Sequence, residues 1–276
     1  MNLDKIKNLR HAGKGFTGDC PVCGYQQALS LNCNDGKHLV YCHGGGCSQR
    51  DLMRVLNESG FQRVKAALTP SVRRKQDISG FIQKLWQQSL PASGTVVDNY
   101  LQSRGICCAI PANIRYLPDC LHRPSGELLP AMLASVVSCN GELRALHRTF
   151  LAIDGSGKAT ANPPKMALGG IKGYSTHLAP ATDELVITEG IETGLSVMVA
   201  TGKPVWAALS AGGIQSLILP SLPLASEITI AADADQVGMR TASIAAQRFR
   251  EEGRKVKIST PPQGMDFNDV LRSAAI

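Results

Sequence analysis

Short apolar runs alternate with longer amphipathic segments in the C-terminal third of the chain. Four of the runs are rich in β-branched residues, which favours strands, and they span 184–188, 205–209, 227–232 and 255–259. Segments with helical spacing of apolar residues lie between them, at 192–201, 214–219 and 237–252. Gly202 and Gly253 follow two of these segments as expected helix ends. We therefore expect an α/β domain with a mostly parallel sheet and flanking helices.

The middle of the chain predicts a smaller α+β subdomain. Helical periodicity marks 78–90 and 96–104, and strand and turn signals fill 106–180. Two strand-like runs, 128–137 and 143–151, flank Asn140-Gly141, a dipeptide that favours a hairpin turn. The preceding residues 62–77 are polar, basic and interrupted by Pro70, as expected of a linker.

The positive charge of the chain is concentrated at its N-terminus. Residues 1–75 contain 12 Lys and Arg against 5 Asp and Glu, which gives 12 − 5 = +7. The rest of the chain contains 29 − 12 = 17 basic and 22 − 5 = 17 acidic residues and is neutral. This asymmetry indicates a nucleic-acid-binding module joined to a neutral one. A solvated basic surface would explain the charge equally well.

Cysteine usage and hydropathy bear on the compartment. The chain has nine cysteines, an odd number, and neither a long apolar run nor the apolar core of a signal peptide. We expect a cytoplasmic protein with no membrane association and no disulfide framework.

Four cysteines in the basic N-terminal segment have metal-ligand spacing. Cys20 and Cys23 form a C-x₂-C pair, and Cys42 and Cys47 form a looser C-x₄-C pair after eighteen intervening residues. The segment between the pairs contains strand-like pieces at 28–31 and 38–41, and a helix capped by Ser48 is expected at 50–56. Paired thiolates in turns around a short β segment predict a zinc ribbon. His43 could replace Cys42 as a ligand, Cys33 is a spare thiol, and unliganded structural cysteines are the alternative.

Two other features are not assigned to binding sites. The remaining cysteines, Cys107, Cys108, Cys120 and Cys139, lack metal spacing, and we expect small buried side chains. Residues 155–158 read Gly-Ser-Gly-Lys, but a phosphate-binding P-loop would need Gly at 152 and a hydroxyl at 159, where the chain has alanine. We interpret this segment as a polar turn.

Carboxylates follow two of the predicted parallel strands. Glu189 comes directly after the strand at 184–188, and Asp233 and Asp235 follow the strand at 227–232. Because ligands of open α/β sheets bind beyond the carboxyl ends of the strands, we expect these acids to lie together. Converging acids repel one another unless a cation neutralises them, so they predict a site for Mg²⁺ or Mn²⁺ suited to phosphoryl transfer. The alternative is that Glu189 caps a helix and the aspartates are turn residues.

These two strand-end motifs together resemble the TOPRIM domain, which bacterial-type DNA primases, topoisomerases and some nucleases share. The four-cysteine ribbon resembles the zinc-binding domain of primases, and the hairpin with Pro164-Lys165-Met166 resembles their basic subdomain. The parts occur in the same order, so the resemblance covers nearly the whole chain. The phrases at 189–193 and 266–271 most resemble compact primase-like proteins of phages, plasmids and integrating elements.

The resemblance implies domains and roles for individual residues. The domains would be a zinc-ribbon template-binding domain at 1–65, a linker at 66–78, a basic nucleotide- and primer-binding subdomain at 79–181 and a TOPRIM catalytic domain at 182–276. Glu189 would act in proton transfer or metal ligation, while Asp233 and Asp235 would hold Mg²⁺ or Mn²⁺. Arg148 and Lys165 would face the nucleotide and the nascent strand, with Lys172 as a weaker candidate that we interpret as a surface lysine.

A second acidic pair usually follows the last strand in primases. Here it reads Asp266-Phe267-Asn268. Asp266 would still join the metal site, but the change to Asn268 leaves the number of bound metal ions open.

The predicted function is that of a DNA primase that synthesises short RNA primers on single-stranded DNA. Its substrates would be ribonucleoside triphosphates and its setting the replication of a mobile element, with a separate helicase or initiator as partner. A TOPRIM metal-dependent nuclease is one alternative, and a non-catalytic DNA-binding or recombination-mediator protein is another. A topoisomerase would need a nucleophilic tyrosine in a large further domain.

Overall fold

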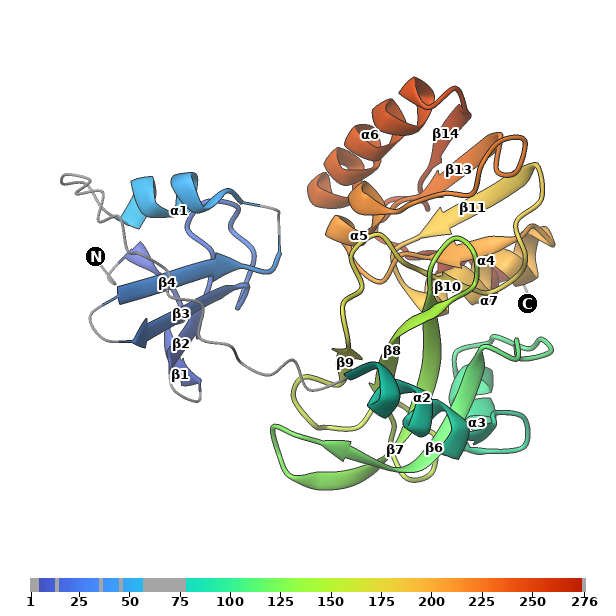
Figure 1. Cartoon of the computed structure of the whole chain (residues 1–276), viewed down its shortest axis with the longest axis horizontal. Coiled ribbons are helices and arrows are strands. Elements are labelled where there is room, and N and C mark those ends of the chain that lie inside the picture. The colour runs from blue at the N-terminus through green and yellow to red at the C-terminus, as the bar shows by residue number, and fades with distance from the viewer. Residues whose placement is uncertain (1–4, 13–14, 35–36, 45–46, 57–77, 275–276) are drawn as a thin grey trace. The chain divides into compact units, whose positions relative to one another are not determined.

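The computed structural model describes residues 5–12, 15–34, 37–44, 47–56 and 78–274, which fall into two compact units, 1–74 and 75–276 (Figure 1). Residues 66–77 of the predicted linker lie outside the described part. The bounds of the predicted domains remain a prediction, and the two units are treated separately.

The N-terminal unit is a four-stranded antiparallel sheet with one helix, α1 (Gln49–Leu56). The strands pair in chain order and are β1 (Arg10–Ala12), β2 (Gly15–Gly18), β3 (Leu29–Asn34) and β4 (Lys37–Cys42). Alternate residues of β3 and β4 point inward, so Leu29, Leu31 and Val40 are buried together with Leu52 and Leu56 of α1. The ribbon strands expected at 28–31 and 38–41 are confirmed, whereas β1 and β2 were not expected.

The first half of the second unit is an antiparallel sheet with two helices, α2 (Ile78–Gln88) and α3 (Val96–Ser103). The sheet runs in chain order through β5 (Leu90–Pro91), β6 (Ile114–His122), β7 (Glu127–Val137), β8 (Leu143–Phe150) and β9 (Lys165–Leu168). The predicted hairpin is confirmed by the pairing of β7 with β8. Gly141 takes a φ of 84° in its turn, a conformation that favours glycine.

The second half is an α/β domain whose sheet has the order β10-β12-β11-β13-β14. Its strands are β10 (Thr176–His177), β11 (Glu184–Thr188), β12 (Val205–Ala207), β13 (Glu227–Ala231) and β14 (Lys255–Ser259). All neighbours run parallel except β10, which pairs antiparallel with β12. The predicted fold class of this domain is therefore confirmed.

Four helices cover this sheet in two layers (Figure 1). They are α4 (Ile191–Thr201), α5 (Ala211–Ser216), α6 (Gln236–Glu251) and α7 (Phe267–Ala274). Val186 faces a core with residues of α4 and α7, whereas Leu185 and Ile187 face a second core with residues of α5 and α6. This alternation follows from the two-residue period of a strand. α4 ends at Gly202 in the left-handed region, as the sequence predicted.

The helix predicted at 214–219 is wrong in register. The observed helix α5 begins at Ala211, because the hydroxyl of Ser210 accepts a hydrogen bond of 2.9 Å from the backbone N–H of Gly213. The chain leaves the helix at Leu217, and this lets Leu217 and Leu219 enter the core without helical geometry. Apolar spacing alone could not separate buried coil from helix here.

The remaining cysteines only partly match their prediction. Cys120 is buried, but Cys107 is exposed and Cys108 and Cys139 are intermediate. The predicted burial of Cys107 is therefore wrong, because of the two adjacent cysteines only Cys108 packs on the core. Lys172 is exposed, as expected of a surface lysine.

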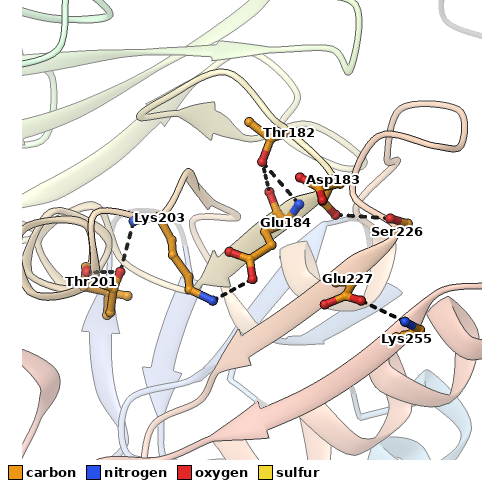
Figure 2. A network of polar contacts seen from close by, with 9 residues as sticks. Thr182, Asp183, Glu184, Thr201, Lys203, Ser226, Glu227 and Lys255 are labelled. Carbon is orange, nitrogen blue, oxygen red and sulfur yellow. Dashed lines mark hydrogen bonds and ion pairs between the residues drawn. The ribbon is translucent and has the colours of Figure 1, made fainter.

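Ion pairs close the amino end of the parallel sheet (Figure 2). Lys203 contacts Glu184 at 2.9 Å, and Lys255 contacts Glu227 at 2.8 Å. A hollow of about 240 Å³ lies among these residues and Lys257. The carboxylates that follow β11 and β13 lie at the other end of these strands, so this hollow is not part of their site. Among the described residues, no helix is long and apolar enough to cross a bilayer.

Candidate functional site

Four thiols of the N-terminal unit converge on one point. The Sγ atoms of Cys20, Cys23, Cys42 and Cys47 lie within 4.8 Å of one another. Cys20 and Cys47 are 3.9 Å apart, and Cys23 and Cys42 are 3.6 Å apart. In the described part of the chain, no other group of three or more such side chains gathers in this way. The ribbon arrangement predicted from the spacing is confirmed.

The structure distinguishes Cys42 from His43. The Nε2 atom of His43 lies 2.7 Å from the hydroxyl of Ser30, and its ring contacts the ring of Tyr41 at a centroid distance of 4.7 Å. Cys42 is buried and belongs to the thiol cluster instead. The side chain of Cys33 lies outside the described residues.

The donor set fits zinc. Soft sulfur ligands in a group of four are those of structural zinc sites. Burial raises the pKa of the Cys20 thiol to about 11, and burial with the neighbouring thiols raises the pKa of Cys47 as well. A bound cation would offset this cost, because coordination stabilises the thiolate form.

The acids predicted at the strand ends influence one another electrostatically. Glu189 follows β11, and the nearby backbone N–H of Ala211, at the start of α5, acts to lower the pKa of its carboxyl group. Partial burial raises the pKa of Glu189, and the negative charges of Asp233 and Asp235 raise it further. The pKa of Asp233 is also raised, by partial removal from water and by the charges of Asp235 and Asp266. The structure therefore brings the four predicted metal-site acids into one electrostatic group.

Asp235 also has a structural role, as a helix cap rather than as the turn residue that the alternative supposed. It is the N-cap of α6, and its Oδ1 accepts a hydrogen bond of 2.6 Å from the N–H of Gly238. A Cβ on Gly238 would lie 2.6 Å from the carbonyl oxygen of Asp233, so only glycine permits this tight start. Glu189 does not cap the helix that follows it, because the N-cap of α4 is Gly190 without a side-chain bond. Asp235 keeps its second carboxylate oxygen for another ligand.

Asn268 occupies the place of the second acid in the usual primase motif but does not face the acids. Its amide group donates hydrogen bonds to the carbonyl oxygen of Arg104 at 2.7 Å and to the hydroxyl of Ser196 at 3.0 Å. A carboxylate could not donate to the carbonyl of Arg104. Asp266 instead caps α7, where its Oδ1 accepts from the N–H of Asp269 at 2.8 Å.

Glu192 is a buried acid that was not predicted as part of the site. Its carboxylate accepts hydrogen bonds of 2.9 Å from the hydroxyl of Tyr100 and 2.9 Å from the ammonium of Lys165. The ammonium of Lys158 lies 3.7 Å away. Burial alone would raise the pKa of Glu192, but Lys165 and Lys158 lower it to about 2. The sequence did offer one signal for Glu192, because it follows Glu189 by three positions.

Lys165 interacts with Glu192 and also, through its charge, with Glu189. It is paired with Glu192, and its positive charge also lowers the pKa of Glu189 against the effect of burial. The contact of Lys165 with a nucleotide remains a prediction.

Arg148 has a different position. It faces the core of the hairpin subdomain, where its guanidinium lies 5.7 Å from the centre of the Phe150 ring and 3.5 Å from the carbonyl oxygen of Leu121. Lys165 pairs with Thr149, the neighbour of Arg148 on β8, so the two basic side chains leave opposite faces of the sheet. The structure does not join Arg148 to the acids, and its nucleotide contact remains a prediction.

The carboxylates fit a divalent cation in their chemistry. They are hard oxygen ligands, and their mutual repulsion would be relieved by a bound ion. The carboxylate oxygens lie farther from one another than the four thiols of the ribbon do. Among the described residues, only those thiols are close enough together to form a ready metal site.

Comparison with known families follows the same division of the chain. Residues 184–276 match the Toprim domain family. Residues 184–276 form a Toprim domain. Residues 76–178 match a family described as a domain of unknown function, DUF7146. The Toprim resemblance carried by the Glu-Gly and Asp-x-Asp motifs is thereby confirmed.

Several solved structures are similar to the chain. A DNA primase domain from Pseudomonas aeruginosa is 14% identical, with 71% of this chain and 74% of that chain covered and a TM-score of 0.48. The zinc-binding and RNA polymerase domains of Aquifex aeolicus primase are 11% identical, with 98% and 78% covered and a TM-score of 0.48. The primase fragment of the bacteriophage T7 primase-helicase is 16% identical, with 96% and 95% covered and a TM-score of 0.42. No curated protein matches the chain significantly.

The cysteine cluster predicts one zinc ion per chain. Cys42→Ala should lose the metal, because it removes one of four ligands, whereas His43→Ala should retain it. Metal analysis of the two purified variants and the unchanged protein measures this directly. Zinc loss in the His43 variant with retention in the Cys42 variant would show that the histidine is the ligand.

The pairing of Glu192 predicts pH-dependent stability. Its folded-state pKa of about 2 lies below the unfolded value of about 4.3, so its contribution is present above that value and is lost as the pH falls toward 2. Glu192→Gln should lower the free energy of unfolding at pH 7 by on the order of 3 kcal/mol. The gap between the two proteins should narrow below about pH 4.

Denaturant unfolding at several pH values checks this. Glu142→Gln is the matched control, because Glu142 is an exposed acid paired with Arg144 and should change stability little. A gap between the Glu192 variant and the unchanged protein that stays constant from pH 7 to pH 3 would contradict the assignment.

Proposed function

We propose that this protein is a DNA primase, a nucleotidyltransferase that synthesises short RNA primers on single-stranded DNA during replication of a mobile element. One observation carries the proposal: Lys165 of the hairpin subdomain is paired at 2.9 Å with Glu192 in the first turn of α4, the helix that follows Glu189. This pair would set a nucleotide site lined by cations next to acids that bind metal, and a zinc ribbon occupies the other unit of the same chain.

The reaction joins a primer to an incoming ribonucleoside triphosphate. The primer 3′-hydroxyl oxygen forms a bond to the α-phosphorus, and the bond from that phosphorus to the bridging oxygen breaks. Pyrophosphate leaves with the electron pair, and the hydroxyl proton passes to a base. Such transfer depends mainly on positioning and on stabilising negative charge.

The residues of the chain divide these tasks. Glu189, Asp233 and Asp235, with Asp266 beside them, would hold one or two divalent cations, Mg²⁺ or Mn²⁺. When bound, such a cation supplies charge neutralisation at the phosphate and a lower pKa for the attacking hydroxyl. Glu189 is suited to accept that proton, because burial and its acidic neighbours raise its pKa. Lys165 would contact the phosphates, and Arg148 remains a candidate contact for the nascent strand.

The ribbon would hold the template. Its residues contribute to the +7 charge of residues 1–75, since 12 basic residues oppose 5 acidic ones there. On β4 the side chains of Leu39 and Tyr41 alternate with the buried Val40 and Cys42, and Tyr41 is 63% exposed. An exposed aromatic ring on a positively charged module is suited to stacking on unpaired bases. A separate helicase or initiator would bring the protein to DNA.

Replacing the strand-end acids tests the chemistry. Asp233→Asn with Asp235→Asn should lower primer synthesis by orders of magnitude, because the charge that holds the cation is removed. Single-stranded DNA binding should stay nearly unchanged. Asp119→Asn, an exposed acid on β6, is the control and should keep full synthesis.

Labelled ribonucleotides on mixed single-stranded templates measure the product. Primers made at the unchanged rate by the double variant would refute the proposal. Metal-dependent shortening of a labelled template without primer formation would identify a nuclease, and DNA binding with neither product would identify a non-catalytic protein.

Tyr41 tests template binding by the ribbon. Tyr41→Ala should weaken single-stranded DNA binding about five- to a hundredfold, because base stacking contributes roughly 1–3 kcal/mol per base. The salt dependence should be unchanged, since no charge is lost. Phe81→Ala is the matched control, because Phe81 is 49% exposed but lies on α2 of the other unit. Equal losses in the two variants, measured by fluorescence anisotropy, would contradict template binding through this face.

A further inference from the structure

Two cations contact the single carboxylate of Glu192. Lys165 is hydrogen-bonded to it at 2.9 Å, and Lys158 lies 3.7 Å from its other oxygen. Arg104, at the end of α3, is close enough to lower the pKa of Lys158 and of Tyr100. The Nε atom of Arg104 is buried and has no hydrogen-bond partner among the described residues. Positive charge at this point therefore exceeds what one carboxylate neutralises.

The two ammonium groups lie at the two oxygens of one carboxylate. Burial lowers the pKa of Lys158, and the positive charge of Lys165 lowers it further. Two positive charges that share one carboxylate repel one another, so the arrangement has a cost unless an anion is bound. Lys158 and Lys165 keep 34% of their side chains exposed, whereas Glu192 keeps 7%. The lysines can therefore accept a ligand from solvent while the acid stays covered.

A purely structural role explains part of this arrangement. One lysine paired with Glu192 would satisfy the buried acid and would fasten β9 to α4. It does not explain a second lysine at 3.7 Å from the same carboxylate, which gives this point more positive charge than Glu192 neutralises. The turn that carries Lys158 is held in place by its own contacts, since Leu151 and Lys158 form a β-bridge.

We propose that Lys158 and Lys165 together form a binding site for a polyphosphate group, with Glu192 and Tyr100 as the residues that position them. Tyr100 fixes one oxygen of Glu192 by a 2.9 Å hydrogen bond, so the carboxylate cannot turn away from the lysines. Each lysine has three N–H donors, and pairing with Glu192 leaves donors for an anion. Lys158 is thus a phosphate-binding residue in addition to Lys165. It ends the segment 155–158, which does not match a P-loop.

The position of the site identifies its substrate class. Lys165 is bonded to Glu192 in the first turn of α4, which follows Glu189 at the carboxyl end of β11, and its charge lowers the pKa of Glu189. A triphosphate could then have its reacting phosphate at the acids and its outer phosphates at the lysines. Lys158 would stabilise the charge that develops on the departing pyrophosphate. This identification of the ligand as a nucleoside triphosphate rests on the proposed function; the anion site itself does not.

The test measures binding of inorganic tripolyphosphate to the full-length protein by calorimetry, without added divalent metal. Lys158→Met should bind it at least about tenfold more weakly, because a charge-assisted contact is lost. Lys158→Arg, which keeps the charge, should restore most of the affinity. Lys172→Met is the matched control, because Lys172 is exposed in the same subdomain, and it should bind like the unchanged protein.

Several outcomes would overturn the site. Unchanged tripolyphosphate affinity in the Lys158→Met variant, with or without a lower melting temperature, would show that Lys158 is only structural. An equal loss in the Lys172→Met variant would show a diffuse basic surface.

Primer synthesis then separates this site from the proposed function. Lys158→Met should raise KM for the ribonucleotide at least about tenfold, with a smaller change in kcat and unchanged template binding. Loss of template binding in parallel with tripolyphosphate binding would overturn the assignment to substrate phosphates. A protein that binds tripolyphosphate through Lys158 but makes no primers would refute the primase while leaving the anion site in place.

Discussion

The second unit depends on a buried carboxylate that must be paired. Glu192 belongs to α4 of the Toprim domain, but its partners come from elsewhere, namely Tyr100 of α3, Lys165 of β9 and the nearby Lys158. An unpaired charge at this depth would be strongly destabilising, so the hairpin subdomain and the Toprim domain are constrained to meet at this point. The same constraint places cations next to the acids at the strand ends.

The acid group shows how one side chain serves stability and chemistry together. Asp235 caps α6 with one oxygen, and this bond orients the carboxylate at the end of β13. The start of α6 thus orients one of the acids, and the positive end of its helix dipole partly offsets the repulsion among them. Metal binding can then draw on groups that are already in place.

Local signals carried much of the architecture. Strand and helix alternation, the glycines that end α4 and α6, and the Asn-Gly turn each act over a few residues, and their predictions agree with the structure. α5 was misplaced because an apolar segment that enters the core as coil has the same composition as a helix. The prediction that Cys107 is buried was wrong for a related reason, because burial depends on neighbours that are distant in sequence.

The sequence by itself determined the Toprim motifs, the four-cysteine spacing and the candidate acids, because each depends on residue type and short spacing. Only the tertiary structure decided between Cys42 and His43, turned Asn268 toward Ser196 and Arg104, and separated Arg148 from Lys165. It also brought Lys158 to Glu192 across thirty-four positions of the chain, 192 − 158 = 34. Such pairings arise from burial and charge among distant elements, and no local pattern encodes which partners will meet.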